Sequence, residues 1–213
     1  MQNSPSDTLA QRQRAVAMAV ALTTDTSLAP QRYERHLLSI YQHGILTIEE
    51  VVELLDLSVY QVLYHSRVTK LPSEADLANL LEWSRNFNAE HQITGMLLYS
   101  EGRYVQVLEG PEADVRALYS RIKADTRHEQ VVTVLEGPSP ERRFADWSMG
   151  FGLLAVPQVD QVLDAVKRQV PYAGLAVDDP HLQALLEAFG SHVVPEQVPG
   201  PTSGIHFTQS VSI

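Results

Sequence analysis

Apolar positions recur with two different periods between residues 59 and 154, which indicates strands separated by helices. Stretches in which apolar and polar residues alternate predict strands, and stretches with apolar residues three or four positions apart predict helices. The expected strands are 61–68, 93–100, 103–109, 129–135 and 147–153, and the expected helices are 73–90 and about 115–122. The order βαββαββ predicts an α+β fold, a ferredoxin-like sheet with both helices on one face.

Helical patterns also flank this block on both sides. Thr47 and Glu50 have the spacing of a capping box, which predicts that a helix begins within a helical extension before the first strand. Apolar residues at helical spacing after Pro157 predict C-terminal helices, which would cover the other face of the sheet or form an interface. The expected parts are a flexible arm (1–30), a helical extension (31–58), the central domain (59–154), C-terminal helices (155–194) and a disordered tail (195–213).

An alanine-rich run from Ala15 to Leu22 follows Arg12 and Arg14, and it has two interpretations. It is either a weak signal peptide or a frayed helix within the arm. We favour the helix because the run is alanine-heavy and follows Asp7. No apolar run approaches the roughly 20 residues that span a bilayer, so we expect no membrane segment and a cytoplasmic location.

Composition narrows the classes of function. Of the 213 residues, 44% are hydrophobic and 20% are charged, a mixture typical of a globular protein. The formal net charge of -10 argues against a broad nucleic-acid surface, which needs clustered cations. The absence of cysteine excludes disulfides, thiolate metal sites and thiol nucleophiles.

Polar residues continue an apolar stripe on the first helix of the central block. Ser84 and Asn88 follow Leu77 and Leu81 at helical spacing. A buried asparagine amide without partners costs a few kcal/mol, so something polar should meet it. Alternatively, both residues lie at the margin of the stripe and bond to water or backbone.

The strands raise the same question with Gln106 and Tyr64. Gln106 shares one strand face with Tyr104 and Leu108, and its amide has two donors and two acceptor lone pairs to satisfy. Either this face is exposed to water or the amide meets a ligand. Tyr64 likewise has two interpretations: it is either an ordinary core tyrosine or a residue of a functional site. The segment Asp125–His128 after the second helix is either a helix cap or a phosphate or sugar site.

Taken together, these segments resemble the BLUF family, flavin-dependent sensors of blue light. The resemblance covers about residues 61–151 and follows the family order. Its six segments are Leu63–Ser66, Phe87–Asn88, Ile93–Tyr99, Gln106–Gly110, Asp125–His128 and Arg143–Met149. The chain is similar to the short, stand-alone members, with N- and C-terminal helical extensions added.

The resemblance implies an FAD held between the two helices, with its ring system reaching toward the sheet. Tyr64 would donate an electron and a proton to the excited flavin, and Gln106 would link Tyr64 to the polar edge of the ring. The remaining residues that the resemblance assigns are Asn88 and Ser84 at the ring edge, Asp125, Arg127 and His128 near the ribityl-phosphate portion, and Trp147 and Met149 as the pair linked to signal output.

The residue types suit this chemistry. A phenol is among the few side chains that an excited flavin oxidises, and its proton can leave through a hydrogen bond. An amide can exchange its donor and acceptor ends without gaining charge, so it is a natural relay. A cysteinyl-flavin adduct is excluded because the chain has no cysteine. His65 and Phe87 depart from the residues often found at these positions.

The resemblance predicts a sensor rather than an enzyme, with no metal, that acts on a downstream regulator protein. We expect a homo-oligomer, because the helical arm before the first strand would serve either for dimerisation or for docking a regulator. No serine-histidine-acid set, metal cluster or Gly-rich phosphate loop marks an enzyme, so a flavin oxidoreductase is the weaker alternative. A second alternative is light-gated DNA binding, because residues 46–62 resemble a helix-turn-helix. Against it, Glu49, Glu50, Glu53 and Asp56 make the first helix acidic.

Overall fold

The centre of the protein is a five-stranded mixed sheet. The computed structural model describes residues 8–154, 157–168, 177 and 179–190. In the sheet the strand order is β4-β1-β3-β2-β5; neighbouring strands are antiparallel except β2 and β5, which are parallel. The strands are β1 (Val59–Val68), β2 (Thr94–Ser100), β3 (Arg103–Gly110), β4 (His128–Ser139) and β5 (Gly150–Leu153).

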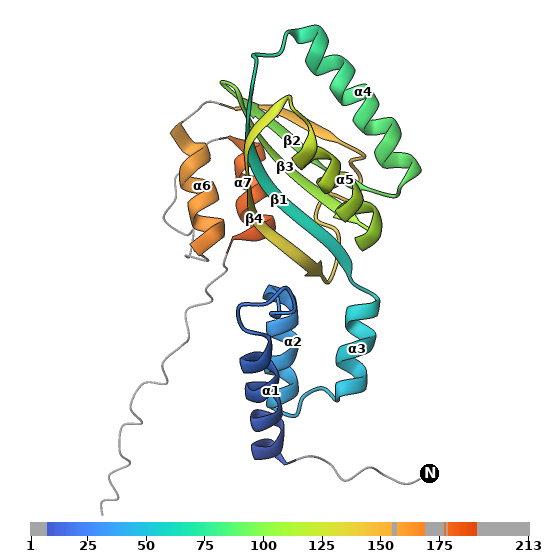
Figure 1. Cartoon of the computed structure of the whole chain (residues 1–213), viewed down its shortest axis with the longest axis vertical. Coiled ribbons are helices and arrows are strands. Elements are labelled where there is room, and N and C mark those ends of the chain that lie inside the picture. Colours follow the sequence, from blue (N-terminus) through green and yellow to red (C-terminus); the bar gives the residue numbers. More distant parts are fainter. Residues whose placement is uncertain (1–7, 155–156, 169–176, 178, 191–213) are drawn as a thin grey trace, which may run out of the picture.

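Two helices lie on one face of this sheet, α4 (Glu74–Glu90) and α5 (Glu112–Ala124) (Figure 1). Helix α4 begins where the sequence predicts, because Ser73 and Asp76 form a reciprocal capping box. Pro111 precedes α5 and supplies the fixed backbone angle of a helix start. The predicted α+β fold with the order βαββαββ is therefore confirmed.

The opposite face is covered by the C-terminal helices α6 (Pro157–Arg168) and α7 (Pro180–Phe189) (Figure 1). Side chains alternate between the two faces along each strand. Leu63 and Val107 join the core under α6 and α7, whereas Tyr64 and Leu108 join the core under α4 and α5. Two apolar cores on one sheet explain why its central strands have few polar residues.

Strands β4 and β5 differ in length from the prediction. β4 extends to Ser139 because it pairs with β1 along nearly its whole length, with register irregularities between Leu63 and Tyr64 and between His65 and Arg67. β5 begins at Gly150 and not at Trp147, because the backbone of Trp147 and Ser148 is held by hydrogen bonds outside the β2–β5 ladder.

The N-terminal region is a three-helix unit below the sheet, made of α1 (Leu9–Thr23), α2 (Arg32–Gln42) and α3 (Ile48–Asp56) (Figure 1). The expected flexible arm over residues 1–30 is therefore wrong for residues 9–23. A Thr8–Gln11 capping box starts α1, and Val16 is buried against α2 and α3 residues. Residues 1–7 and the expected tail at 195–213 lie outside the described residues.

The path from α3 into β1 bears on the DNA-binding alternative. α3 ends at Asp56 and β1 begins at Val59, so no second helix follows α3 where a recognition helix would be needed. The helix-turn-helix interpretation of residues 46–62 is therefore wrong. Among the described helices, none combines the length and the hydropathy needed to cross a membrane.

Candidate functional site

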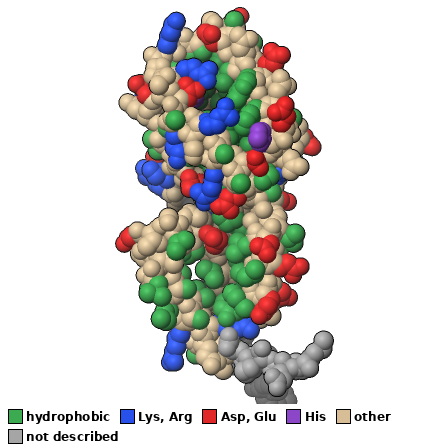
Figure 2. All heavy atoms as spheres, turned by 45° about the vertical axis from the view of Figure 1, so that its right-hand side comes forward, with side chains coloured by type: hydrophobic (Ala, Val, Ile, Leu, Met, Phe, Trp, Pro, Cys, Tyr) green, Lys and Arg blue, Asp and Glu red, His purple; other side chains and the backbone are tan. Residues whose placement is uncertain are grey.

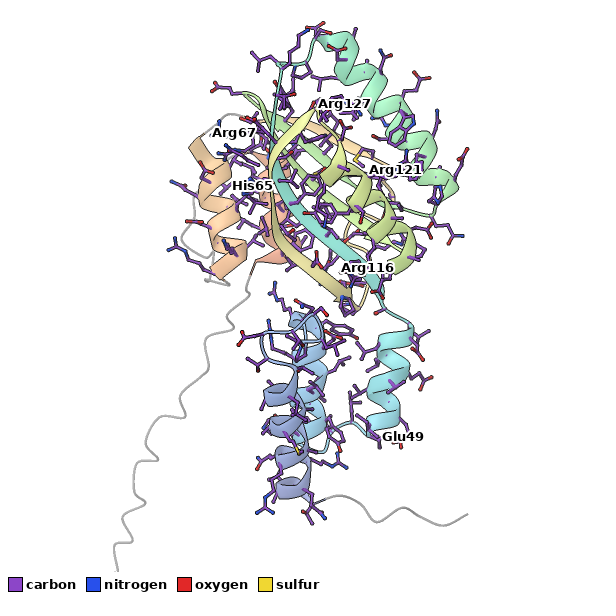
Figure 3. The ribbon with its side chains drawn as sticks, viewed as in Figure 1. Glu49, His65, Arg67, Arg116, Arg121 and Arg127 are labelled. Carbon is purple, nitrogen blue, oxygen red and sulfur yellow. The ribbon has the colours of Figure 1, made fainter. Side chains whose placement is uncertain are left out.

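A cavity of about 760 Å³ lies between α4, α5 and the sheet. Its size is in the range of pockets that hold cofactors. In Figure 3, Arg121 on α5 and Arg127 at the start of β4 lie on this side of the sheet, and His65 lies on the α6 side. The residues expected at the site that line this cavity are Tyr64, Ser84, Asn88, Gln106, Asp125, Arg127, His128 and Met149.

Tyr64 and Gln106 meet at the inner wall of the cavity. They are direct partners in the β1–β3 ladder, so the sheet register places both side chains on the same face. The Tyr64 hydroxyl donates a hydrogen bond to Gln106 Oε1. Tyr64 is fully buried, and this burial raises the pKa of its hydroxyl, so the phenol stays protonated.

The other end of the Gln106 amide points to the loop before β5. Gln106 Nε2 lies 3.6 Å from the Met149 sulfur, a weak acceptor, so its donor capacity is hardly used. Met149 is only 2% exposed, whereas Trp147 is 42% exposed and does not line the cavity. The structure thus has Met149 inside and Trp147 outside. The Trp147 ring packs on Gly150, where an added Cβ would lie 2.3 Å from it.

Helix α4 reaches the same loop with two side chains. Asn88 Nδ2 donates to the carbonyl of Ser148 at 2.6 Å, and Arg85 Nε donates to the carbonyl of Met149 at 3.2 Å. Ser84 and Asn88 are both buried, so neither lies at an exposed margin of the stripe, although Asn88 does bond to backbone. Arg85 was not predicted from the sequence, because its partner lies 64 residues further along the chain.

A buried carboxylate anchors the beginning of this loop. Glu109 accepts hydrogen bonds from the backbone N–H groups of Arg143 and Phe144 at 2.9–3.0 Å. Arg142 donates to the carbonyls of Glu109 and Gln92, so both β3 and the end of α4 hold it. These contacts fix where the chain turns back toward Trp147 and Met149.

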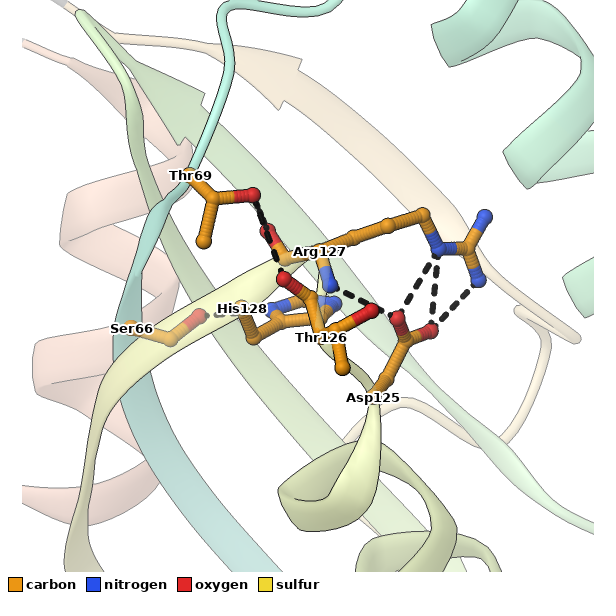
Figure 4. A network of polar contacts seen from close by, with 6 residues as sticks. All are labelled: Ser66, Thr69, Asp125, Thr126, Arg127 and His128. Carbon is orange, nitrogen blue, oxygen red and sulfur yellow. Dashed lines mark hydrogen bonds and ion pairs between the residues drawn. The ribbon is translucent and has the colours of Figure 1, made fainter.

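The segment Asp125–His128 forms a polar rim at the cavity (Figure 4). The Arg127 guanidinium donates to both carboxylate oxygens of Asp125 and lowers the pKa of that carboxyl to about 2. His128 Nδ1 lies 2.9 Å from Ser66 Oγ, and burial lowers the pKa of its imidazole. A neutral imidazole and an exposed guanidinium therefore stand side by side at the rim.

An aromatic and cationic stack closes the outer side of the cavity between α4 and α5. The Arg121 guanidinium lies 5.5 Å from the ring centre of Trp83 and 5.1 Å from that of Phe87. Phe87 stacks on His91, which bonds Asp114 on α5 at 2.9 Å. Arg121 and Trp83 line the cavity but were not predicted. The aromatic spacing i, i+4, i+8 on α4 was the available signal.

The side chains of the cavity fit a flavin. A phenol and two amides stand at the inner end, where a planar ring with a polar edge needs both donors and acceptors. Leu80, Leu97 and Ile122 provide apolar walls. Lys70, Arg121 and Arg127 supply cations where an anionic pyrophosphate would need them. Within the described residues, no group of His, Asp and Glu could hold a metal ion.

Comparison with known proteins agrees with this chemistry. Residues 59–150 match the family "BLUF: Sensors of blue-light using FAD". The chain is 39% identical over 95 residues to the photoactivated adenylate cyclase subunit beta of Euglena longa, which covers 44% of this chain and 11% of that protein. It is 30% identical over 105 residues to the blue light- and temperature-regulated antirepressor BluF of Escherichia coli strain K12, covering 49% of this chain and 26% of that protein.

Among solved structures, the dark-state structure of BlrB, a BLUF protein, is similar with 27% sequence identity and a TM-score of 0.46, covering 62% of this chain and 97% of that chain. The chain spans well under a third of the length of the two curated relatives, so their complete activities are not its own by similarity. The family match covers the segment that contains Tyr64, Asn88 and Gln106. Residues 59–150 thus match the BLUF family, sensors of blue light that use FAD.

Proposed function

We propose that the chain is a blue-light receptor in which Tyr64 and Gln106 turn flavin excitation into a rearranged hydrogen bond. The observation that carries this proposal is the Tyr64–Gln106 hydrogen bond at the inner wall of the cavity. FAD, when bound, supplies the absorption of blue light and accepts an electron. Asn88 and Ser84 would hold the ring edge, and Asp125, Arg127 and His128 would hold the ribityl-phosphate portion.

Tyr64 provides the electron and the proton. Its hydroxyl is protonated in the dark because burial raises its pKa, and its hydrogen bond to Gln106 Oε1 gives the proton a path out. Gln106 can then rotate or tautomerise, because its Nε2 loses only a weak contact with the Met149 sulfur. The return in darkness needs no covalent bond to break.

The output runs through Met149 and Trp147. Gln106, Arg85 and Asn88 all contact residues 148–149. When the Gln106 amide rearranges, its contact with Met149 changes, and this alters how the chain just before β5 is held. The direct contact between the Gln106 amide and the Met149 sulfur supports this path.

We propose that the chain senses light and does not catalyse a reaction. BLUF domains are sensors, and no enzymatic domain is evident in the part of the chain that the structure describes. The output then requires a downstream regulator protein, and we propose a homo-oligomer, with the central domain (59–154) distinct from the helical extensions. Direct DNA binding is disfavoured by the acidic face of α3. The cytoplasmic location stays a prediction.

The decisive measurement is a light-minus-dark absorption spectrum of the purified chain with FAD. We expect a flavin band that moves reversibly to longer wavelength under blue light. Gln106→Leu should keep the flavin and lose this shift. Gln61→Leu is the matched control, since Gln61 is also a buried strand glutamine but does not line the cavity. A normal shift in Gln106→Leu would contradict the proposed relay.

A further inference from the structure

Helix α1 presents an apolar stripe to solvent on the side opposite its contact with α2. Val16 and Val20 face the core shared with α2 and α3. At 100° per residue, Ala15, Met18 and Leu22 lie on the far side of the helix. Met18 is 66% exposed and Leu22 is 71% exposed. A helix that is apolar on both sides is normally buried on both sides. The stripe of Ala15, Met18 and Leu22 would therefore be expected to pack against another surface.

The exposed apolar surface extends beyond α1. Figure 2 shows hydrophobic side chains gathered over the part of the molecule built by α1–α3, with acidic side chains along one edge. Exposed apolar residues of this unit outside α1 include Leu28, Ile45, Ile48 and Val52. Monomeric proteins rarely expose contiguous apolar patches of this kind unless a partner covers them.

We propose that this stripe is the contact between two copies of the chain, with the two α1 helices packed antiparallel about a two-fold axis near Met18. The proposal builds on the homo-oligomer suggested above and names its surface. In this register Ala15 lies opposite Leu22 of the second copy, and Met18 lies opposite Ala19. Each large side chain therefore meets an alanine, which lets the helices approach closely.

The charges of α1 support the same orientation. α1 has no acidic residue in its first turn and no basic residue in its last turn, although its C-terminal end carries the negative end of the helix dipole. Antiparallel packing brings Arg14 of one copy to this end of the other copy, next to Asp25. Within the described residues, neither Arg14 nor Asp25 takes part in an ion pair.

A lipid surface fits the same stripe less well. Helices that lie on membranes carry Lys and Arg along a polar face, whereas the basic residues of α1, Arg12 and Arg14, lie in its first two turns. Arg12 is also engaged, because its guanidinium donates to the carbonyls of Tyr41 and Leu46. The net charge of -10 opposes approach to anionic lipid. A contact made by one pair of short helices is small compared with the roughly 1,200 Å² buried in stable complexes, so we expect a reversible dimer.

Sedimentation equilibrium of the full chain with FAD tests the surface. Wild type should show a monomer–dimer equilibrium, and Met18→Glu should weaken dimerisation about 100-fold, because each copy would bury a carboxylate. Leu57→Glu, at a leucine 73% exposed just after α3, is the control and should dimerise as wild type. A wild type that is monomeric throughout overturns self-association, and a dimer that survives Met18→Glu overturns only the α1 surface.

Cross-linking tests the antiparallel register, because the natural chain has no cysteine. In Ala15→Cys/Leu22→Cys, oxidation should join position 15 of one chain to position 22 of another, as peptide mass spectrometry would show. The two positions within one helix are too far apart to bridge. Links of 15 to 15 and 22 to 22 would indicate a parallel pair and overturn the geometry. Binding to phosphatidylserine vesicles that Met18→Glu abolishes, by a monomeric wild type, would assign the stripe to lipid.

The light response separates these outcomes from the proposed sensing function. Met18 and Leu57 lie outside the cavity, so both variants should keep the reversible red shift of the flavin band. A normal shift in a monomeric Met18→Glu protein leaves both proposals standing. A missing shift in wild type would contradict light sensing without bearing on the α1 contact.

Discussion

The Tyr64 hydroxyl combines deep burial with a hydrogen bond to a weakly held amide. Its ring lies 5.1 Å from that of Tyr119, so two phenols stand close together on the same side of the sheet. Only Tyr64 lines the cavity; the Tyr119 hydroxyl bonds Thr133 Oγ1 at 2.7 Å. The two neighbouring tyrosines therefore differ in their access to the cavity and in their hydrogen-bond partners, and only Tyr64 is placed to react with a bound flavin.

Tyr64→Phe should abolish the reversible red shift while the flavin stays bound. The change removes the electron and proton donor and leaves Gln106 Oε1 without this bond, at a cost of about 1 kcal/mol in stability. Tyr119→Phe is the control, and its difference spectrum should keep the wild-type form. Unaltered photochemistry in Tyr64→Phe would remove Tyr64 from its proposed role.

His128 makes stability depend on pH. Burial lowers the pKa of its imidazole below 6.5, so the unfolded chain takes up this proton at a higher pH than the folded chain does. Stability should therefore fall as the pH drops below 6.5, toward the lowered pKa. His128→Gln should reduce this fall, measured as the thermal midpoint above and below pH 6.5. His65, whose pKa burial also lowers, serves as the comparison through His65→Gln, and an unchanged pH dependence in His128→Gln would contradict the assignment.

Sequence patterns could identify some site residues and not others. Gln106 and Asn88 interrupt apolar stripes, and a buried amide in such a stripe is a local signal of a polar partner. Arg85 and Arg121 gave no such signal, because arginines on a helix surface are ordinary. The spacing of the aromatic residues on α4 could mark Trp83 and Phe87. That Arg121 contacts this pair, and that Arg85 contacts Met149, becomes visible only when the helices and the loop are placed in space.

At the scale of elements, the loop between β4 and β5 is held by a carboxylate within the sheet. Glu109 lies on β3, yet its side chain accepts hydrogen bonds from the backbone of Arg143 and Phe144. This bond substitutes for regular secondary structure at residues 140–146. The position of Met149 beside Gln106 therefore depends on an anchor several residues earlier.

Glu109→Gln should destabilise the protein by about 2 kcal/mol, because one acceptor oxygen becomes an N–H₂ donor that faces backbone N–H groups. Denaturant unfolding would measure this loss. The exposed Glu129 on β4 provides the control, and Glu129→Gln should change stability by less than about 0.5 kcal/mol. If the two substitutions lower the free energy of unfolding equally, the hydrogen bonds of Glu109 contribute no more to stability than an exposed glutamate does.

Helices and strands could be predicted from the sequence where the spacing of apolar residues agrees with the capping or turn residues at the ends of the element. Ser73 and Asp76 marked the start of α4, and an apolar run between the Glu101–Gly102 turn and Gly110–Pro111 marked β3. α1 was expected only as a frayed helix within a flexible arm, because its apolar residues lie on both sides of the helix and give no single stripe. The length of β4 was underestimated because its pairing with β1, and not its own pattern, decides where it ends.

At the scale of the whole molecule, the N-terminal and C-terminal extensions meet. The Arg32 guanidinium at the start of α2 donates to the carbonyl of Phe189 at 2.7 Å, and it also reaches the carbonyl of Gly190 at 3.4 Å. These carbonyls end α7, where a cation is favoured by the helix dipole. The two helical extensions are thus joined directly, at a point remote from the cavity.

Arg32→Ala should therefore loosen α7 although the two residues that make this contact are 157 positions apart. Burial lowers the pKa of the Arg32 guanidinium, which shows that its charge is partly removed from water and that its hydrogen bonds must compensate for that loss. We expect a loss of about 1–2 kcal/mol and faster amide exchange in α7, measured by hydrogen–deuterium exchange. Arg35→Ala is the control, because Arg35 donates to the Pro30 carbonyl in an exposed position. If α7 exchanges at the same rate in both variants, α2 does not support the C-terminal helices, and any signal between the extensions must pass through the sheet.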